Sequence, residues 1–251
     1  MPDLTPYFLM ASLVAFLIGM SKGGLGGTLG ALATPLMALV MPANKVIGLI
    51  LPVLIFADLF AVSFHWRRWD RKIILLLVPA SVVGVVAGAF FLSRVSPDTL
   101  KLTLGVITLI VAAYKLLESR IGRTASYQPR DWHGYVAGGV AGFSSTLAHT
   151  GGPPASIYLL MQNISPRVFI ATSALFFLIL NWLKVPFYWR SGLFDAASLR
   201  TMLLPALIFV PSGAWVGRWL GLRMNKQTFE QVIAVLLLFS GILLIYQVVT
   251  A

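Results

Sequence analysis

Residues 8–41 read FLMASLVAFLIGMSKGGLGGTLGALATPLMALVM, an apolar run that is interrupted in its middle by Ser21-Lys22-Gly23-Gly24-Leu25-Gly26-Gly27. A straight helix over the whole run would be about 51 Å long at 1.5 Å per residue. That is too long for one crossing of a hydrocarbon core about 30 Å thick. Split at the glycines, each arm would measure about 17–20 Å. The run therefore predicts a broken hairpin that enters and leaves the bilayer by the same face.

A second stretch has the same character. Residues 132–162 are largely apolar and are broken by His149-Thr150-Gly151-Gly152-Pro153-Pro154. Irregular backbone is tolerated at membrane depth only where it is buried in protein or lines a cavity. We therefore expect both breaks to lie inside the protein and to mark its functional site.

Six further runs are long and apolar enough to cross a bilayer as helices of about 20 residues. They cover residues 46–64, 73–93, 101–117, 168–187, 200–220 and 231–249. Four glycines within them are expected to let neighbouring helices pack closely. These are Gly84, Gly88, Gly213 and Gly217. The sequence predicts an all-α polytopic membrane protein with about eight membrane segments.

The composition excludes several other classes of protein. Of the 251 residues, 58% are hydrophobic and 11% are charged, whereas a soluble domain carries about 25% charged residues. The absence of cysteine excludes disulfides and thiolate metal sites, and the three histidines and eight carboxylates suggest neither a metal centre nor a cofactor. The net charge of +11 comes from short loops between apolar runs, as the positive-inside rule predicts. The expected surrounding is a lipid bilayer, and nucleic acid is not an expected partner.

The two halves of the chain share one order of segments, a broken run followed by three spans. Aligned by this order, Gly26-Gly27 matches Gly151-Gly152, Asp58 matches Asn181, and Trp66-Arg67 matches Trp189-Arg190. We interpret residues 1–117 and 132–251 as two transmembrane repeats, joined by the polar linker 118–131.

The basic residues predict the orientation of these repeats. If each broken segment returns to its own side, one face holds Arg67, Arg68, Arg71, Lys72, Lys115, Arg120, Arg123, Arg130, Arg167, Arg218, Arg223 and Lys226, and the other holds Lys45, Arg94, Lys101, Arg190 and Arg200. The basic residues are distributed more unequally between the two faces than they would be if the broken segments crossed the membrane fully. The face with more basic residues, which also holds the linker, is therefore expected to be cytoplasmic. Three full crossings per repeat would invert the second copy relative to the first, an architecture typical of secondary transporters. Both termini are then expected to be periplasmic.

The breaks also predict a binding site. A helix that restarts within the membrane presents unpaired N–H groups with partial positive charge, which suit an anion. The candidate binding residues are Ser21, Lys22, Gly23, Gly24, Gly26, Gly27 and Thr28 at the first break, and Ser144, Ser145, Thr146, His149, Thr150, Gly151 and Gly152 at the second. Hydroxyl donors, a cation and an imidazole together would suit a small oxyanion.

Several ionisable residues have more than one interpretation. Lys22 either binds the anion in a cavity or extends along the hairpin to water. Asp58 is the carboxylate well inside an apolar run. It relays protons, binds a coupling cation, or pairs with Lys22 or Lys184. Asp58 and Asn181 are together the candidate coupling pair. His149 either binds the substrate or makes a structural hydrogen bond. Lys184 and Arg190 are expected to reach toward one membrane face.

Three stretches resemble the TauE/SafE family of sulfite exporters. They are Gly19-Met20-Ser21-Lys22-Gly23-Gly24-Leu25-Gly26-Gly27, the segment 138–154 that ends in His149-Thr150-Gly151-Gly152-Pro153-Pro154, and Asn181-Trp182-Leu183-Lys184. The resemblance covers nearly the whole chain. It implies a plasma membrane protein of bacterial type that moves sulfite, sulfoacetate or a related organosulfonate, usually outward.

The leading interpretation is therefore a secondary transporter that exports a small sulfur-containing anion, and not an enzyme. No serine-hydrolase elbow, zinc-protease or Walker motif occurs in the sequence. Two alternatives stay open, a membrane-embedded enzyme of the lipid phosphatase type and a passive anion channel. Phosphate release from a lipid would favour the first, and flux that does not saturate would favour the second.

Overall fold

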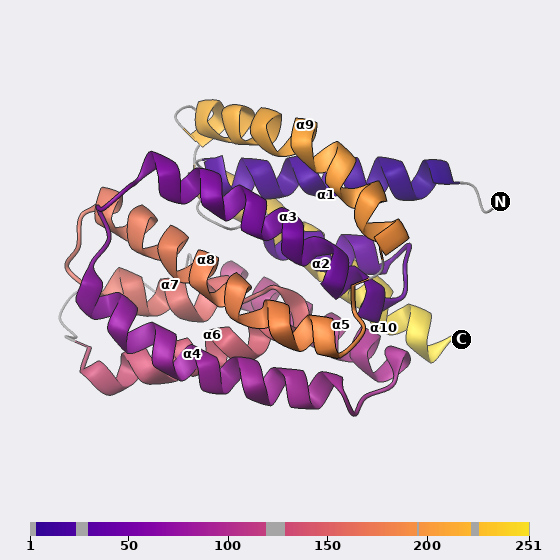
Figure 1. The fold of residues 1–251 in the computed structure, drawn as a ribbon, viewed down its shortest axis with the longest axis horizontal. Coiled ribbons are helices and arrows are strands. Elements are labelled where there is room, and N and C mark those ends of the chain that lie inside the picture. Colours follow the sequence, from indigo (N-terminus) through magenta and orange to yellow (C-terminus); the bar gives the residue numbers. More distant parts are fainter. Residues whose placement is uncertain (1–3, 24–29, 119–128, 195, 222–225, 251) are drawn as a thin grey trace.

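The computed structural model describes residues 4–23, 30–118, 129–194, 196–221 and 226–250, and every regular element in these ranges is an α-helix. In chain order they are α1 (Leu4–Gly23), α2 (Gly30–Ala38), α3 (Ala43–Phe64), α4 (Arg71–Leu92), α5 (Pro97–Glu118), α6 (Asp131–Ala148), α7 (Gly152–Met161), α8 (Pro166–Arg190), α9 (Ala196–Gly221) and α10 (Lys226–Val249). The helices lie roughly along one common direction (Figure 1).

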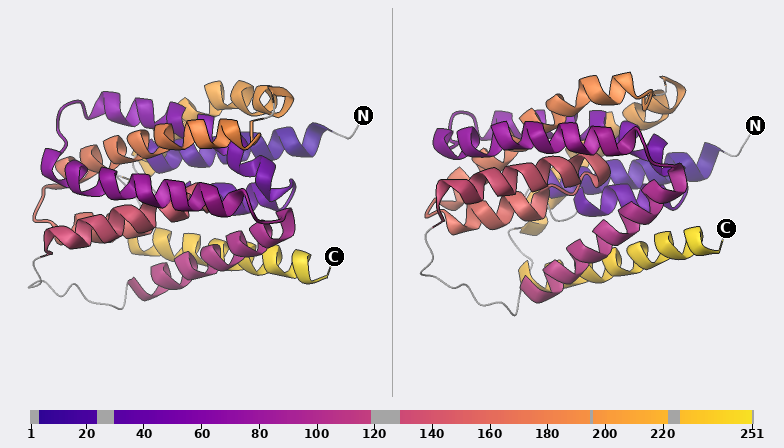
Figure 2. Two further views of the ribbon diagram at one scale, coloured as in Figure 1. Left: turned by 60° about the horizontal axis from the view of Figure 1, so that its bottom comes forward. Right: turned by 90° about the horizontal axis from the view of Figure 1, so that it is seen from below.

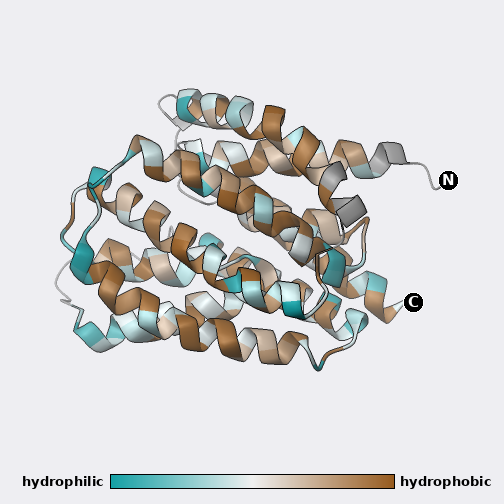
Figure 3. Ribbon diagram, viewed as in Figure 1, coloured by the Kyte–Doolittle hydropathy of each residue, from teal (hydrophilic) through white to brown (hydrophobic). Residues whose placement is uncertain are grey.

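Six of these helices are long and apolar enough to cross a membrane, and each covers one of the six expected runs. The spans are Ala43–Phe64, Arg71–Leu92, Pro97–Leu117, Arg167–Arg190, Met202–Leu220 and Gln231–Val249. Their hydrophobic residues cover the helix bodies, and hydrophilic ones gather toward the ends (Figure 3). Large apolar side chains such as Leu75, Ile208 and Phe239 are 69%, 68% and 63% exposed, which lipid tolerates and water does not. The prediction of a polytopic membrane protein is confirmed.

The helix bundle has two distinct ends. Both chain termini lie at one end, which we name the terminus face (Figures 1 and 2). The opposite end, which we name the basic face, carries the exposed side chains of Arg67, Arg68, Arg71, Lys72 and Arg130.

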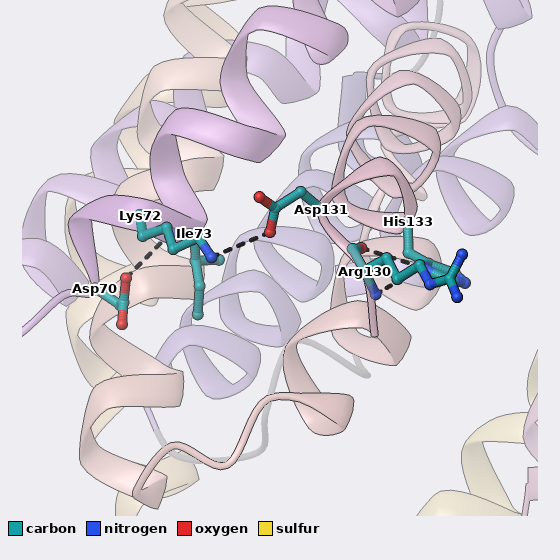
Figure 4. Close-up of polar contacts among 6 residues, drawn as sticks. All are labelled: Asp70, Lys72, Ile73, Arg130, Asp131 and His133. Carbon is teal, nitrogen blue, oxygen red and sulfur yellow. Dashed lines mark hydrogen bonds and ion pairs between the residues drawn. The ribbon is translucent and has the colours of Figure 1, made fainter. Parts of the chain in front are cut away.

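The second broken segment, α6 and α7, enters and leaves by the basic face. At the start of α4, Lys72 Nζ lies 3.1 Å from Asp131 Oδ1 at the start of α6 (Figure 4). The N–H of Asp70 in the same region donates to Thr172 Oγ1 near the start of α8 at 2.9 Å. Because α6 and α8 both begin beside Asp70 and Lys72, the chain between them must return to the face from which it came.

The first broken segment, α1 and α2, enters from the terminus face. Gly19 of α1 faces Val210 of α9, and Gly23 faces Ala214, so α1 and α9 run in the same direction. Since α9 follows the end of α8 at the terminus face, α1 begins there as well, and α3 begins at the same face after α2. The two broken segments therefore enter the bundle from opposite faces, as the sequence predicts.

The arms of the broken segments are unequal, so the expected lengths of about 17–20 Å for the arms of the first segment are wrong. α1 has 20 residues and α6 has 18, which gives about 30 Å and 27 Å, whereas α2 with nine and α7 with ten span about 14–15 Å. α1 is longer because the helix already begins at Leu4, before the apolar run, and continues through Ser21-Lys22-Gly23, which the sequence assigned to the break. Pro6 lies in its first turn, where proline is tolerated. Each broken segment is a long helix followed by a short one.

Glycine allows the closest helix pairs, which are α1 with α9, α4 with α6 and α5 with α10; the last pair lies side by side in both views of Figure 2. A Cβ at Gly138 or Gly142 of α6 would collide with the backbone of α4, and one at Gly213 or Gly217 of α9 would collide with the backbone of α1. The packing role expected for the span glycines is confirmed. In both interfaces the long helix of one broken segment packs on the second full span of the other half, which is the pattern that two equivalent halves would give.

Candidate functional site

Asp58 on α3 joins the first break to the centre of the bundle. α3 is the most buried of the spans, with 67% of its apolar window inside the protein, and the Asp58 side chain is fully buried. Lys22 Nζ, at the end of α1, lies 2.5 Å from Asp58 Oδ1. Asn181 of α8 donates from Nδ2 to Asp58 Oδ2 at 2.6 Å. Of the roles considered for Asp58, the structure contains the ion pair with Lys22.

Lys184 joins α8 to the second break. Its side chain is fully buried, and Nζ donates to Ser145 O at 3.3 Å and to Ser145 Oγ at 3.1 Å, with His149 Nδ1 at 3.0 Å. In the described part of the chain, no carboxylate lies within ion-pair distance of this ammonium group. The expectation that Lys184 extends to a membrane face is wrong. The reason is the end of α6, where the hydroxyl and the carbonyl of Ser145 and the ring of His149 supply acceptors inside the bundle; the same carbonyl also accepts the N–H of His149 at 3.0 Å.

His149 links α6 to α3. It ends α6 in the left-handed conformation with φ of 55°, where histidine is enriched among non-glycine residues. Because the lysine ammonium group can only donate, Nδ1 of His149 is the acceptor. Nε2 then carries the hydrogen and donates to the carbonyl of Ile47 at 3.0 Å. Of the two roles considered for His149, the structural hydrogen bond is present.

These contacts form two groups of largely buried side chains, one at each break, which are joined only through the helices α3 and α8; together we name them the polar chain. It consists of Lys22, Asp58, Asn181, Lys184, Ser145 and His149. The carbonyl of Ile47 accepts the hydrogen bond from His149. On α3, Ile47 and Asp58 lie three helical turns apart, about 16 Å at 1.5 Å per residue. The breaks are thus connected through α3 and α8 over about half the thickness of a hydrocarbon core.

Most of the expected hydroxyl donors at the second break are bound to backbone. Ser144 Oγ donates to Val140 O at 2.8 Å, Thr146 Oγ1 to Gly142 O at 2.8 Å, and Thr150 Oγ1 to Ser144 O at 3.4 Å. Ser145 differs, because its hydroxyl receives Lys184 and keeps its own hydrogen for another acceptor. Ser21 at the first break is 2% exposed, and its hydroxyl has no hydrogen-bond partner in the described structure. Among the candidate residues that the structure describes, these two serines keep a hydroxyl hydrogen for a ligand.

The backbone at the breaks offers fewer donors than the sequence analysis assumed. Pro153 and Pro154 occupy the first turn of α7 and have no N–H group, which leaves Gly152 as the donor there. Gly151 lies against Ala141 of α6, where a Cβ would not fit. Gly23 packs against α9 in the same way. Gly24, Gly26, Gly27 and Thr28 lie outside the described residues.

Sequence reasoning missed Tyr188 and the buried role of Lys184. Tyr188 is 1% exposed, and its hydroxyl donates to Thr146 O at 2.5 Å. Asn181, Lys184 and Tyr188 are spaced three and four residues apart, which places them on one helix face. That spacing is visible in the sequence and could have identified all three. Thr34 on α2, buried with an unpartnered hydroxyl, carries no comparable signal.

A cavity of about 640 Å³ opens at the terminus face. It is lined by Asn44, Val86, Ala89, Phe90, Leu92, Ser93, Val95, Pro97, Leu100, Phe187, Arg190, Ser191 and Leu193. Asn44 precedes Ile47 by about one turn of α3, and Phe187 follows Lys184 by about one turn of α8. The cavity therefore ends one helical turn from the polar chain.

Comparison with known families identifies the chain. The family described as "Sulfite exporter TauE/SafE" matches residues 11–244, a range that includes both breaks and the whole polar chain. Curated proteins and solved structures give no significant match. The chain belongs to the TauE/SafE sulfite exporter family, a family of membrane transporters.

Proposed function

We propose that the protein is a secondary transporter that exports a small sulfur-containing anion, such as sulfite, sulfoacetate or a related organosulfonate, across a bacterial inner membrane. The observation that carries the proposal is the buried polar chain between the two helix breaks. Family membership supports the class of substrate. The membrane potential, negative inside, favours the exit of an anion by about 2.3 kcal/mol per charge per 100 mV.

The charges of the polar chain support an anion as the substrate. Lys22 and Lys184 bring two cations, and Asp58 brings one carboxylate to Lys22 alone. In this proposal Lys184 is protonated when the anion is bound, and with His149 neutral the balance then leaves one positive charge at Lys184. An unbalanced charge inside a membrane is costly, and a bound anion would balance it. In this proposal the anion replaces one of the three acceptors of Lys184, the hydroxyl of Ser145 donates to it, and Ser21, Lys22 and Gly152 are the other candidates at the breaks that line the site.

Asp58 and Asn181 are proposed as the coupling pair. While Asp58 is ionised it holds Lys22, so Lys22 is not free to bind a substrate. Protonation of Asp58 would release Lys22 and add a second cation to the site. Anion binding would then be linked to proton uptake.

The proposed transport cycle uses the two repeats, 1–117 and 132–251, with 118–131 as the cytoplasmic linker. Movement of one repeat against the other would expose the midplane site to each side in turn. In this proposal both termini are periplasmic. Reporter fusions at the two ends should both give a periplasmic signal; a cytoplasmic signal at either end contradicts the inverted layout.

The proposal is tested by flux of sulfite, thiosulfate, sulfoacetate and taurine in liposomes that contain the purified protein. At least one anion should show saturable flux, and Lys22→Ala should weaken that flux without preventing membrane insertion. Lys72→Ala is the matched control, because its exposed ion pair with Asp131 contributes little to stability. Unaltered kinetics in Lys22→Ala would remove Lys22 from the site. Release of phosphate from lipid, or flux that never saturates, would instead favour the enzyme or the channel.

A further inference from the structure

We propose that the cavity at the terminus face is a second anion-binding site, a vestibule through which the transported anion passes, and that Tyr188 closes its inner end. The inference rests on the proposed function only in treating the polar chain as the inner transport site. The walls of the cavity come from the start of α3, the end of α4, the start of α5 and the end of α8. Four helix ends thus surround a space of about 640 Å³, far larger than a small oxyanion.

The polar groups of the cavity favour an anion. Arg190 lines it, and among the described residues no carboxylate lies within ion-pair distance of its guanidinium group. A guanidinium group binds an oxyanion through two parallel hydrogen bonds. A second cation lies close by, because Arg94 stacks 4.4 Å from the ring of the lining residue Phe90.

Tyr188 lies between the cavity and the polar chain. It follows Lys184 by one turn on the same face of α8 and directly follows the lining residue Phe187. Its ring packs edge-on against His149, with centroids 6.2 Å apart, and lies 6.3 Å from the ring of Phe194. Its hydroxyl holds the ring in place through Thr146 O. An anion that leaves Lys184 for the cavity must therefore displace this ring.

Apolar side chains pack beyond Asp58 at the opposite end of the polar chain. Ala61 and Val62 follow Asp58 on α3 and pack with Ala174 into a buried cluster. Trp69, Leu175 and Leu178 pack against this cluster. Toward the terminus face, in this proposal, the ring of Tyr188 separates the polar chain from the cavity.

The vestibule can be tested by thiol labelling, since the natural sequence has no cysteine. Ser191→Cys places one thiol in the lining, and Thr250→Cys places one on the exposed end of the same face as a control. Each thiol is labelled in proteoliposomes with an anionic reagent, sulfonatoethyl methanethiosulfonate, and with a cationic one, trimethylammonioethyl methanethiosulfonate. The rate with the anionic reagent divided by the rate with the cationic reagent should be about tenfold higher for Ser191→Cys than for Thr250→Cys. Arg190→Gln should bring that ratio down to the control value. Equal ratios, or no effect of Arg190→Gln, would overturn the anion site.

Protection by sulfoacetate separates the vestibule from the inner site. Sulfoacetate should slow the labelling of Ser191→Cys even when Lys184→Met has disabled the inner site. If sulfoacetate protects Ser191→Cys but the protein with Lys184 intact transports none of the anions, the proposed function is contradicted and the vestibule stands. If that protein transports sulfoacetate but sulfoacetate gives no protection, the vestibule is contradicted and the proposed function stands.

The closing role of Tyr188 has its own measurement. Labelling of Ser145→Cys from the terminus face should become faster with Tyr188→Ala, and it should not change with Trp189→Ala, whose side chain is 75% exposed. Tyr188→Phe keeps the ring and removes one hydrogen bond, so it should accelerate labelling by about three- to tenfold; it provides the comparison if Tyr188→Ala does not fold. Unchanged labelling in Tyr188→Phe, or in a folded Tyr188→Ala, shows that Tyr188 does not close the vestibule.

Discussion

Replacement of Lys184 by methionine should lower saturable anion flux in proteoliposomes by about 10- to 150-fold, the effect of losing a hydrogen bond to a charged group. Lys184 is the cation of the polar chain that no described carboxylate neutralises, so the transported anion depends on it most. Methionine has a similar length and fills the same space. Flux of each anion at several concentrations provides the measurement.

The flux of folded protein separates this role from a purely structural one. Lys184→Met removes the donor to His149 Nδ1 and to Ser145, so the free energy of unfolding should fall by about 1–3 kcal/mol in either case, and only a transport role also lowers the flux per folded protein. If Lys184 only caps the end of α6, stability should fall and the flux of folded protein should stay unchanged. That outcome would remove Lys184 from the site.

The second large effect is expected at Asp58. Asp58→Ala leaves the ammonium group of Lys22 and the amide of Asn181 without their partner. Breaking a buried pair from one side costs about 3–5 kcal/mol, and the free energy of unfolding in detergent should fall by that amount. The double variant Lys22→Met with Asp58→Ala should recover most of the loss, because it leaves no unpaired charge. If the double variant is as unstable as Asp58→Ala, the ion pair is not the cause.

Asp58→Asn provides the functional comparison at the same position. The amide keeps the shape of the side chain and removes its proton exchange, so any pH dependence of transport should disappear. Transport measured across a pH series in Asp58→Asn and in the natural protein decides the point. A pH dependence that persists unchanged makes Asp58 a structural residue.

The sequence predicts the spans and the breaks well because both depend on local composition. About twenty consecutive apolar residues predict a membrane span, and a cluster of glycines predicts a helix break, whatever the rest of the fold is. The six spans are found where expected. The opposite entry of the two broken segments also follows from counting basic residues loop by loop. The unequal arms do not, because the start of α1 at Leu4 lies outside the apolar pattern.

The candidate site is predicted less completely because its contacts join distant segments. Ser145 and Lys184 are 39 residues apart, and Asn181 and Asp58 are 123 apart; only the folded chain shows which of them meet. Expecting Lys184 at the membrane surface treats it as an isolated residue and ignores the carbonyl groups at the end of α6. Likewise, Ser144 and Thr146 are candidate ligands by type, but their hydroxyls are bound within α6.

Counterflow of labelled sulfite in proteoliposomes tests the central claim most directly. Vesicles loaded with unlabelled sulfite and diluted into a trace of labelled sulfite should transiently accumulate label above equilibrium, because one site between the breaks opens to each side in turn. In Lys184→Met this accumulation should develop about 10- to 150-fold more slowly. Uptake that rises only to equilibrium, or accumulation that Lys184→Met leaves intact, would contradict an anion site between the two helix breaks.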